Sequence, residues 1–388
     1  MMRGRPLSRY AELGVNVKKP GIEKFKEIVD NLYPEAFCVV QRDPSDPETG
    51  LVTHADSAGS KPIQAYIMYR ETGDASWFRG LAQDALAMNI NDVLCVGADP
   101  LTFVDYVAFN TLQIERVPLL GALSEGFSGC LDTLRNEGTP LMFAGGETAD
   151  LPDLLRTLDV CVTMVGRARL RDIVTGGRVA PGDVIVGLRS GGPVRYEKGV
   201  NSGVMSNGHT LARASLMNPD YVKRYPEASH PAGGRYRGRF RFDDHLDELG
   251  ATVGEALLSP TRLYAPIAKA ALRRVGSGVH GMVHNTGGGQ TKCLRLGRGI
   301  EYVKDGLPDP DPIFGLIQRE GGVDWREMYQ VFNMGVGYEF IVGPGFVDDV
   351  VSAAEAFGLG VHVVGRCEPS KGGNTLRVSS PHGEFLYS

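Results

Sequence analysis

The stretch THADSAGSKP, residues 53–62, places Asp56 and Lys61 five positions apart among small residues. A carboxylate can bind a hard metal ion, and an ammonium group can pair with phosphate. The usual phosphate-binding loop pattern is absent, because only Gly59 precedes the lysine and Pro62, which lacks a backbone N–H, follows it. An ordinary polar turn between two strands is the alternative interpretation of this stretch.

A helix is predicted over residues 80–100, GLAQDALAMNINDVLCVGADP. Asp84 and Asn91 are seven positions apart, so they lie within about 20° of each other on a helix, and Asp92 lies about 80° from them. We expect the apolar face to pack and this stripe to present a carboxylate and an amide to a ligand. A stripe that only faces solvent is the alternative, but it would usually carry Lys, Arg or Glu, and residues 81–100 contain none.

The segment LMFAGGETADLP, residues 141–152, has an apolar run, then Gly145 and Gly146, then Glu147. We expect a strand and a tight glycine turn, with Glu147 just past the strand end, where open α/β sheets bind ligands. A turn with an incidental glutamate is the alternative. If Asp56, Asp84 and Glu147 converge, they form an oxygen-lined site suited to Mg²⁺ held between the protein and a polyphosphate.

Four segments in the second half place small or polar residues at the mouth of an apolar run: SNGHTLAR (206–213), LLSPTRLYAP (257–266), VHNTGGGQTK (283–292) and FNMGVGYEFIV (332–342). The run Gly287, Gly288, Gly289 exposes backbone N–H groups of the kind that bind phosphate. His209 and His284 stand in these segments, and His54 stands beside Asp56. A structural role is the alternative for each histidine.

Composition and charge narrow the class of protein. A chain of 388 residues is long enough for two domains, and 42% hydrophobic with 22% charged residues is typical of a globular protein. The net charge of −5 and the lack of a large basic region indicate a small-molecule substrate rather than nucleic acid. No run approaches the roughly 18 apolar residues that span a bilayer, so we expect no membrane partner and a cytoplasmic protein.

The six cysteines are scattered singly, with no C-x-x-C pair and mostly apolar neighbours. We therefore expect reduced core residues and no zinc site.

The chain is expected to be a mixed α/β protein of two domains. Residues 158–166 and 183–188 are predicted strands, and residues 346–360 are a predicted amphipathic helix followed by the strand VHVVG. A polar segment rich in Gly and Pro near residue 170 is the predicted boundary between domains 1–170 and 171–388. Residues 218–244 and 297–312 are predicted loops, the second within an insertion near 297–320, and the first, rich in arginine, either reaches an anionic ligand or is a solvated insertion.

Read in order, these segments resemble a known family. The blocks ADSAGSK, QDALAMNINDVLCVGADPLTFVDYVA, MFAGGETADLP, MSNGHTLAR, LLSPTRLY, HNTGGG and FNMGVG, spread from about residue 10 to about residue 367, are similar to those of phosphoribosylformylglycinamidine cyclo-ligase, also called aminoimidazole ribonucleotide synthetase, of purine biosynthesis.

The resemblance implies two α/β domains, with the first domains of a homodimer pairing into a β-barrel and ATP bound near the seam. The implied reaction uses ATP to close the ring of formylglycinamidine ribonucleotide and releases aminoimidazole ribonucleotide, ADP and phosphate. The substrate amide oxygen is phosphorylated, and the amidine nitrogen then attacks the same carbon. Such a reaction needs positioning and charge neutralisation more than a protein nucleophile.

The resemblance also implies roles for residues of this sequence. Asp56, Asp84 and Glu147 would hold Mg²⁺, and a requirement for K⁺ is left open. Lys61, Asp84, His209 and His284 are the expected catalytic residues. The expected nucleotide and phosphate contacts are Asp56, Gly59, Ser60, Lys61, Asn91, Asp92, Gly145, Gly146, Ser206, Asn207, Gly208, Gly287, Gly288 and Gly289; which glycine loop holds the substrate phosphate is left open.

The sequence departs from the family pattern at three places. Ser57 replaces a glycine of the first block, no His directly precedes Ser206, and the glycine-rich segment expected ahead of the first block is missing. The alternatives are another ATP-using member of the superfamily, such as thiamine monophosphate kinase or selenophosphate synthetase, and a catalytically silent nucleotide-binding paralogue. The lack of a cysteine before Cys38 disfavours the selenophosphate enzyme, and the presence of Asp84 and Glu147 disfavours the silent paralogue.

Overall fold

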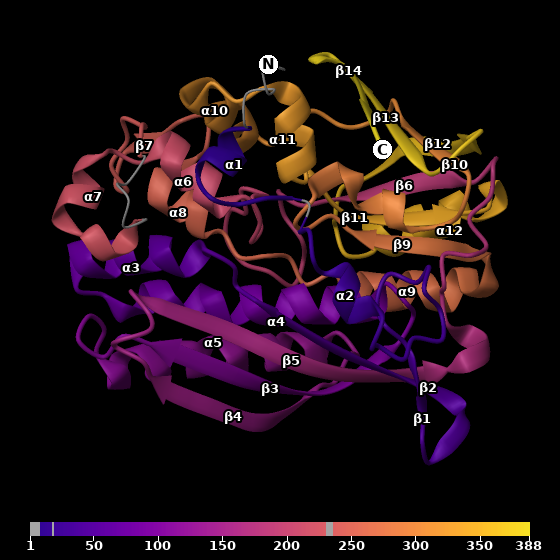
Figure 1. Cartoon of the computed structure of the whole chain (residues 1–388), viewed down its shortest axis with the longest axis horizontal. Coiled ribbons are helices and arrows are strands. Elements are labelled where there is room, and N and C mark those ends of the chain that lie inside the picture. Colours follow the sequence, from indigo (N-terminus) through magenta and orange to yellow (C-terminus); the bar gives the residue numbers. More distant parts are fainter. Residues whose placement is uncertain (1–7, 18, 230–235) are drawn as a thin grey trace.

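Two β-sheets, with helices between and beside them, organise the chain in this computed structural model, which describes residues 8–17, 19–229 and 236–388 (Figure 1). The first sheet has five strands in the order β1-β2-β5-β3-β4. Their bounds are Gln41–Asp43, Asp46–Ser57, Leu158–Arg169, Asp99–Phe109 and Met142–Asp150, in that order. Only β3 and β4 run parallel, and the other neighbours are antiparallel.

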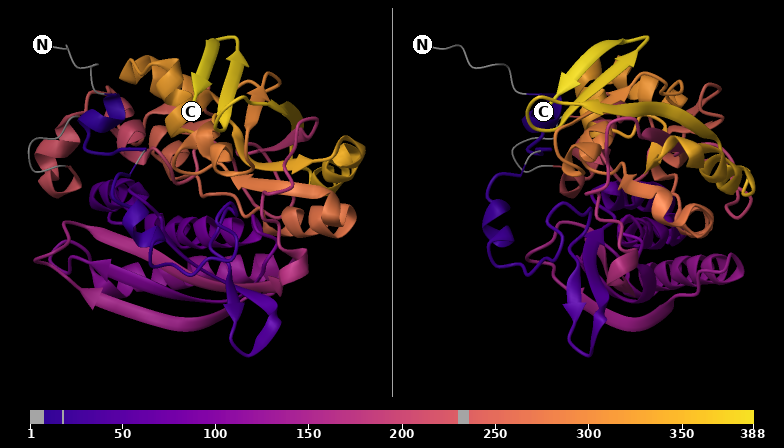
Figure 2. Two further views of the ribbon diagram at one scale, coloured as in Figure 1. Left: turned by 45° about the vertical axis from the view of Figure 1, so that its right-hand side comes forward. Right: turned by 90° about the vertical axis from the view of Figure 1, so that its right-hand side faces the viewer.

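Three helices cover one face of the first sheet: α3 (Lys61–Thr72), α4 (Arg79–Leu94) and α5 (Arg116–Asn136). Strand β5 explains this packing, because its buried residues Leu158, Val160, Val162 and Met164 alternate with less buried ones. In both views of Figure 2 this sheet forms the outer layer of the molecule, and no helix of the described chain lies on its other face.

The second sheet has seven strands in the order β14-β13-β10-β12-β6-β11-β9. Their bounds are Gly383–Tyr387, Thr375–Ser380, Ile300–Lys304, Val361–Pro369, Val184–Arg189, Val336–Val342 and Val279–His284, in that order. Helices α9 (Ala265–Val275) and α12 (Val347–Glu355) pack together beside it. Every residue of β11 is buried, so the core of this half lies around that strand.

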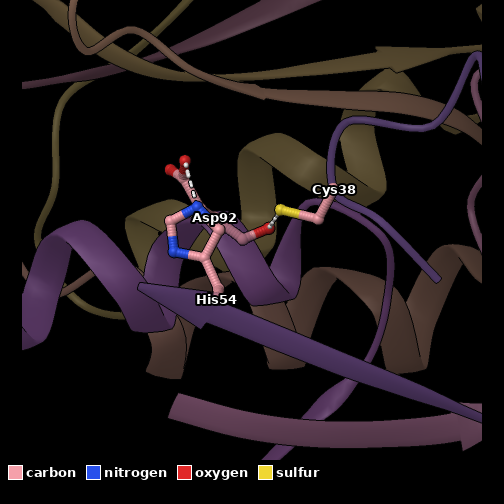
Figure 3. A group of neighbouring side chains, drawn as sticks. All are labelled: Cys38, His54 and Asp92. Atoms are coloured by element: carbon pink, nitrogen blue, oxygen red, sulfur yellow. Dashed lines mark hydrogen bonds and ion pairs between the residues drawn. The ribbon is translucent and has the colours of Figure 1, made fainter. Parts of the chain in front are cut away.

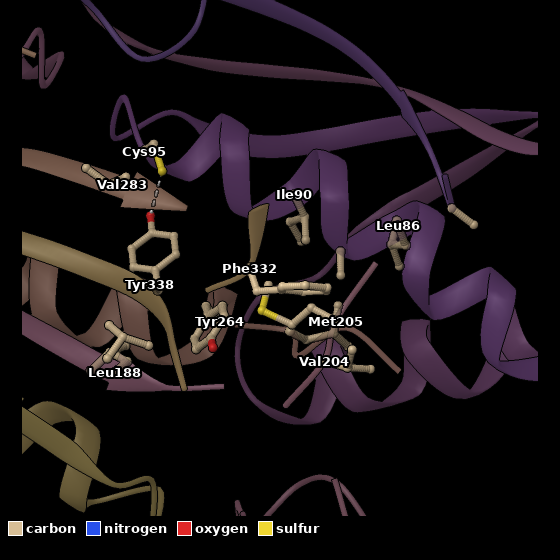
Figure 4. Close-up of a cluster of buried hydrophobic side chains, with 14 of the residues drawn as sticks. Leu86, Ile90, Cys95, Leu188, Val204, Met205, Tyr264, Val283, Phe332 and Tyr338 are labelled. Carbon is tan, nitrogen blue, oxygen red and sulfur yellow. Dashed lines mark hydrogen bonds between the residues drawn. The ribbon is translucent and has the colours of Figure 1, made fainter. Parts of the chain in front are cut away.

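Helix α4 lies between the two halves and is buried along most of its length. Its apolar residues Leu86 and Ile90 face Met205 and Phe332 of the second half (Figure 4). The predicted helix is confirmed over Arg79–Leu94, while residues 99–100 belong to β3. The alternative of a stripe that only faces solvent is wrong, and the role of the stripe toward a ligand stays a prediction. The polar stripe lacks Lys, Arg and Glu because it contacts the second half of the chain instead of water.

Shorter elements complete the described chain. The remaining helices are α1 (Arg9–Glu12), α2 (Glu23–Lys26), α6 (His209–Leu216), α7 (Asp220–Arg224), α8 (Val253–Leu258), α10 (Pro312–Gly321) and α11 (Trp325–Val331). A small hairpin pairs β7 (His245–Leu246) with β8 (Ala251–Thr252). Short 3₁₀ helices lie at 75–78, 170–172, 226–228, 276–278, 289–295 and 344–346.

The predicted α/β architecture, the strands near 158–166 and 183–188, and the helix within 346–360 are confirmed. The prediction of a loop over 297–312 is wrong, because residues 300–304 form the strand β10 inside the second sheet, where Lys304 is buried and its Nζ lies 2.6 Å from Glu339 Oε1. The composition-based prediction missed this strand because a lysine usually indicates an exposed segment, and Lys304 is buried. The segment 218–244 holds α7 and long irregular stretches, and its residues 230–235 lie outside the described chain.

None of the helices in the described ranges combines the length and the apolar character needed to cross a membrane. The barrel at a dimer interface involves a second chain and stays a prediction.

Candidate active site

Asp84 is the centre of a buried polar cluster where the two halves of the chain meet. Its Oδ1 accepts hydrogen bonds from Lys61 Nζ at 2.7 Å and from the backbone N–H and Oγ1 of Thr261, both at 2.7 Å. Ser206 Oγ lies 2.9 Å from the same oxygen. The other oxygen, Oδ2, is buried without a hydrogen-bond partner among the described residues. An unpartnered buried carboxylate oxygen is unfavourable, so this side of Asp84 suits a cation or a donor from a ligand.

Lys61 is the first residue of α3, with Pro62 in the first turn, where a missing N–H is harmless. The alternative interpretation of this stretch as a turn between two strands is therefore wrong, because β2 leads into a helix. The Lys61 side chain is fully buried, and Nζ also donates to the Ser259 carbonyl at 2.6 Å. Burial lowers the pKa of Lys61 below its usual value, although Asp84 raises it. Contact between Lys61 and a phosphate stays a prediction.

The loop before Lys61 packs against helix α6 of the second half. Ser60 Oγ lies 2.9 Å from Thr210 Oγ1, and the Ser60 carbonyl accepts a hydrogen bond from Arg213 at 2.9 Å. Gly59 has φ +65°, and a Cβ there would lie 3.0 Å from the Ser206 carbonyl oxygen. The first motif of the chain therefore lies against the Ser-Asn-Gly motif and helix α6 of the second half.

The Ser-Asn-Gly motif also adjoins the triple glycine. A Cβ on Gly287 would lie 3.5 Å from Asn207 Oδ1, and Asn207 Nδ2 is buried without a partner among the described residues. Gly288 has φ +106° and Gly289 has φ +49°, conformations that other residues rarely adopt. The structure thus brings together the two glycine loops that the sequence predicted to bind phosphate. Their phosphate contacts stay a prediction.

His209 begins α6, directly after Gly208, which has φ +69°. Its Nε2 donates to the Met205 carbonyl at 2.7 Å, and its Nδ1 is buried without a described partner. Burial, followed by the nearby Lys61 ammonium, holds the pKa of His209 well below its usual value. The imidazole is therefore neutral, with an acceptor lone pair on Nδ1.

Asp92 and His284 form a second buried pair. Asp92 Oδ1 lies 2.6 Å from His284 Nδ1, and Asn91 Nδ2 lies 3.3 Å from His284 Nε2. Burial raises the pKa of Asp92, but the hydrogen bond from His284 and nearby positive charges outweigh it and hold the pKa below its usual range. Burial lowers the pKa of His284. Asn91 also accepts from the Tyr264 N–H at 2.9 Å, so the pair joins α4 to the second half.

Asp56 lies near the end of β2, where its Oδ1 accepts from the Ser57 N–H at 2.8 Å. Burial, with a smaller contribution from Asp92, raises the pKa of Asp56. Asp56 is thus a neighbour of Asp92 at the far end of the polar stripe from Asp84.

Glu147 is an exposed residue inside β4, not past its end. The predicted glycine turn is wrong, because β4 continues through Gly145 and Gly146 with an irregularity in its pairing to β3. Gly145 has φ +93°, and a Cβ on Gly146 would lie 2.3 Å from the Asp105 carbonyl oxygen, so the glycines allow a bulge against β3.

The three carboxylates predicted to bind Mg²⁺ do not meet within this chain. In the part of the chain that the structure describes, Asp56, Asp84 and Glu147 do not form a group with all ligand atoms within 4.8 Å of one another. Their joint metal role stays a prediction that needs a rearrangement or a second chain.

The sequence analysis did not select Thr261 or Ser259, although both stand in the LLSPTRLYAP segment. Thr261 contacts Asp84 and Ser259 contacts Lys61, and each of these partners lies far away in the sequence.

Two family models match this chain, one over each half. Residues 35–168 match the model of the N-terminal domain of AIR synthase related protein, and residues 180–376 match the model of its C-terminal domain. A phosphoribosylformylglycinamidine cyclo-ligase of Methanothermobacter thermautotrophicus is 35% identical over 87% of this chain and 85% of its own. A cyclo-ligase of the same name from Methanocaldococcus jannaschii is 35% identical over 81% of this chain and 77% of its own.

Solved structures share the fold at low identity. A structure of AaThiL complexed with AMPPCP and TMP has a TM-score of 0.56 at 13% identity and covers 95% of this chain and 96% of its own. A likeness at this identity supports the fold alone.

Proposed function

The chain belongs to the AIR synthase related family, and from this premise we propose that it is an ATP-dependent cyclo-ligase that converts formylglycinamidine ribonucleotide to aminoimidazole ribonucleotide, ADP and phosphate in purine biosynthesis. The observation that carries the proposal is the 35% identity to a named cyclo-ligase over 87% of this chain and 85% of the relative. Small soluble substrates suit a cytoplasmic enzyme, which is part of the proposal.

The buried polar atoms without partners support a polar ligand at the junction of the two halves. Asp84 Oδ2, Asn207 Nδ2 and His209 Nδ1 are three of them, and they stand on α4, on the Ser-Asn-Gly motif and at the start of α6. An acceptor carboxylate beside donor and acceptor groups fits a phosphorylated ligand with its cation. Bound Mg²⁺ would neutralise charge on the transferring phosphoryl group.

The proposed roles of the residues follow from these positions. Asp84 offers its free oxygen to the cation, while Lys61 and Thr261 hold the other oxygen in place. The glycine loops 206–208 and 287–289 orient the phosphates through backbone N–H groups. His209, neutral and with Nδ1 free, is positioned to accept a proton rather than to supply charge.

We also propose a homodimer formed through the open face of the first sheet, with the barrel that the resemblance implies. On the open face, the exposed apolar side chains include Val104 and Tyr106 of β3 at 40% and 41% and Met142 of β4 at 65%. Phe143 belongs to the other face, where its ring packs against Phe103 and against Phe127 of α5. Exposed apolar side chains on a sheet face that no described helix covers are typical of a surface that another protein covers. A division into two domains near residue 170 fits the passage from β5 of the first sheet to β6 of the second.

Phosphate release tests the proposed activity. Purified protein with Mg²⁺ and ATP should release phosphate when formylglycinamidine ribonucleotide is added, and thiamine monophosphate or selenide should give no stimulation. A lack of stimulation by the ribonucleotide overturns the assignment, and stimulation by one of the other two substrates moves the protein to that branch of the superfamily.

A further inference from the structure

Cys38, His54 and Asp92 come from three separate segments and lie together beside the C-terminal part of α4 (Figure 3). One ligand atom of each lies within 4.8 Å of the ligand atoms of the other two, and no other such group of His, Cys, Asp and Glu occurs in residues 8–17, 19–229 and 236–388. Sequence analysis predicted no metal ligand among the cysteines, because Cys38 has no second ligand near it in the sequence. In the folded chain, His54 and Asp92 lie beside Cys38.

Asn89 determines which nitrogen of His54 is free. The Asn89 amide Nδ2 donates to the carbonyls of Asp56 at 3.1 Å and Ala85 at 2.8 Å. Since carbonyls only accept, the other end of this amide is Oδ1, and it lies 2.9 Å from His54 Nδ1. Nδ1 therefore carries a proton, and in the neutral imidazole Nε2 has a free lone pair. Metal-binding histidines typically hold the second N–H in this way.

The free Nε2 of His54 faces Asp92 Oδ2 at 3.5 Å. Two acceptor atoms that face each other repel unless a positive charge lies between them. In a tetrahedral site with metal–ligand bonds of about 2.1 Å, two ligand atoms lie roughly 3.4 Å apart. The observed separation is thus the one that two ligands of a single ion would have.

We propose that Cys38, His54 and Asp92 bind a transition-metal ion of the Zn²⁺ class. A donor set of one sulfur, one nitrogen and one oxygen favours such an ion over Mg²⁺ or Ca²⁺. Cys38 Sγ now donates to the Asp92 carbonyl at 3.1 Å. Metal binding replaces the thiol proton, which passes to solvent, with a bond from the thiolate to the ion. Three protein ligands leave a fourth position for water.

The surrounding charges fit a divalent cation. The Asp56 carboxylate interacts electrostatically with Asp92, and the Lys292 ammonium interacts with both. Together with a Cys38 thiolate, and counting the Arg295 guanidinium that also interacts with Cys38, these groups leave the site net negative, which favours a bound cation. The site shares Asp92 with the nucleotide contacts that the resemblance implies, but none of its three ligands belongs to the Asp84 cluster.

Cobalt binding tests the proposal. Full-length protein stripped with a chelator and titrated with Co²⁺ should bind a single equivalent and develop a near-ultraviolet thiolate-to-cobalt charge-transfer band. Cys38→Ser should lose that band. Cys161→Ser removes a neighbouring thiol that donates to the Asp56 carbonyl but lies outside the group, so it should keep the band. No cobalt binding, or a band that persists in Cys38→Ser, overturns the proposal.

Two further variants keep the test decisive if Cys38→Ser does not fold. His54→Gln should abolish the rise in melting temperature that Zn²⁺ gives the stripped wild type. Asn89→Ala, which releases the His54 ring, should weaken Zn²⁺ affinity by about 10–100-fold. Equal Zn²⁺ affinity in all these proteins overturns the proposal. None of these measurements depends on turnover, so failure of the cyclo-ligase assay would overturn the proposed function without affecting the proposed metal site.

Discussion

Lys61 Nζ lies 2.7 Å from Asp84 Oδ1, and both side chains are fully buried. The two residues are 23 positions apart in sequence and come from consecutive helices, α3 and α4. Removal of one partner from such a pair leaves an uncompensated buried charge, whereas removal of both does not. The pair therefore links the stability of the first half to the chemistry proposed for Asp84.

Asp84→Asn should abolish turnover and also destabilise the fold by about 3–5 kcal/mol, because Lys61 loses its counter-charge. The double variant Lys61→Met/Asp84→Asn should regain part of the lost stability without regaining turnover. Urea denaturation and the phosphate assay measure the two effects. Full activity in Asp84→Asn would remove Asp84 from the reaction.

His209 should make the protein less stable in mild acid. Burial holds the pKa of His209 in the folded protein well below the usual 6.5, so only the unfolded state takes up a proton as the pH falls through about 6.5. The free energy of unfolding therefore decreases below this pH, by up to about 1.4 kcal/mol per pH unit. His209→Gln, whose amide can still donate to Met205, should show a smaller loss between about pH 7.5 and about pH 5.5. Identical pH slopes for the two proteins would contradict the neutral buried imidazole.

Gly289→Ala should destabilise the second half. A Cβ there would lie 2.3 Å from the Phe332 carbonyl oxygen, and φ is +49°. The backbone strain alone costs about 1–3 kcal/mol. Gly121→Ala is the matched control, because Gly121 lies on α5 with nothing within 4 Å of an added Cβ and should gain up to about 1 kcal/mol. Chemical denaturation of both variants compares them, and equal changes would contradict close packing at Gly289.

Tyr106→Asp should break the proposed homodimer, because a buried unpaired carboxylate would stand in the apolar face of β3. Val117→Asp is the control, since Val117 is 81% exposed on α5, on the helical side of the sheet. Light scattering after gel filtration measures the molar mass. A monomeric wild type, or a Tyr106→Asp variant that stays dimeric, would contradict an interface on this face.

The sequence alone predicted the two-part α/β architecture, the helix that became α4, and the strands and helix near 158–166, 183–188 and 346–365. Apolar patterning marked β5, β6, β12 and α12, because an alternating pattern, a continuous apolar run or a one-sided helical pattern depends only on near neighbours. The order of the motifs also pointed to the family. Local patterns are sufficient where the structure is determined by residues a few positions apart.

Only the tertiary structure decided what each polar side chain contacts. It buried α4 on both sides, turned Lys61 into the partner of Asp84, and placed Glu147 on an exposed edge strand away from the other two carboxylates. It also brought Cys38, which stands alone in the sequence, to His54 and Asp92. These contacts join residues tens to hundreds of positions apart, so they depend on how the two sheets pack across α4, and no short segment of sequence determines that packing.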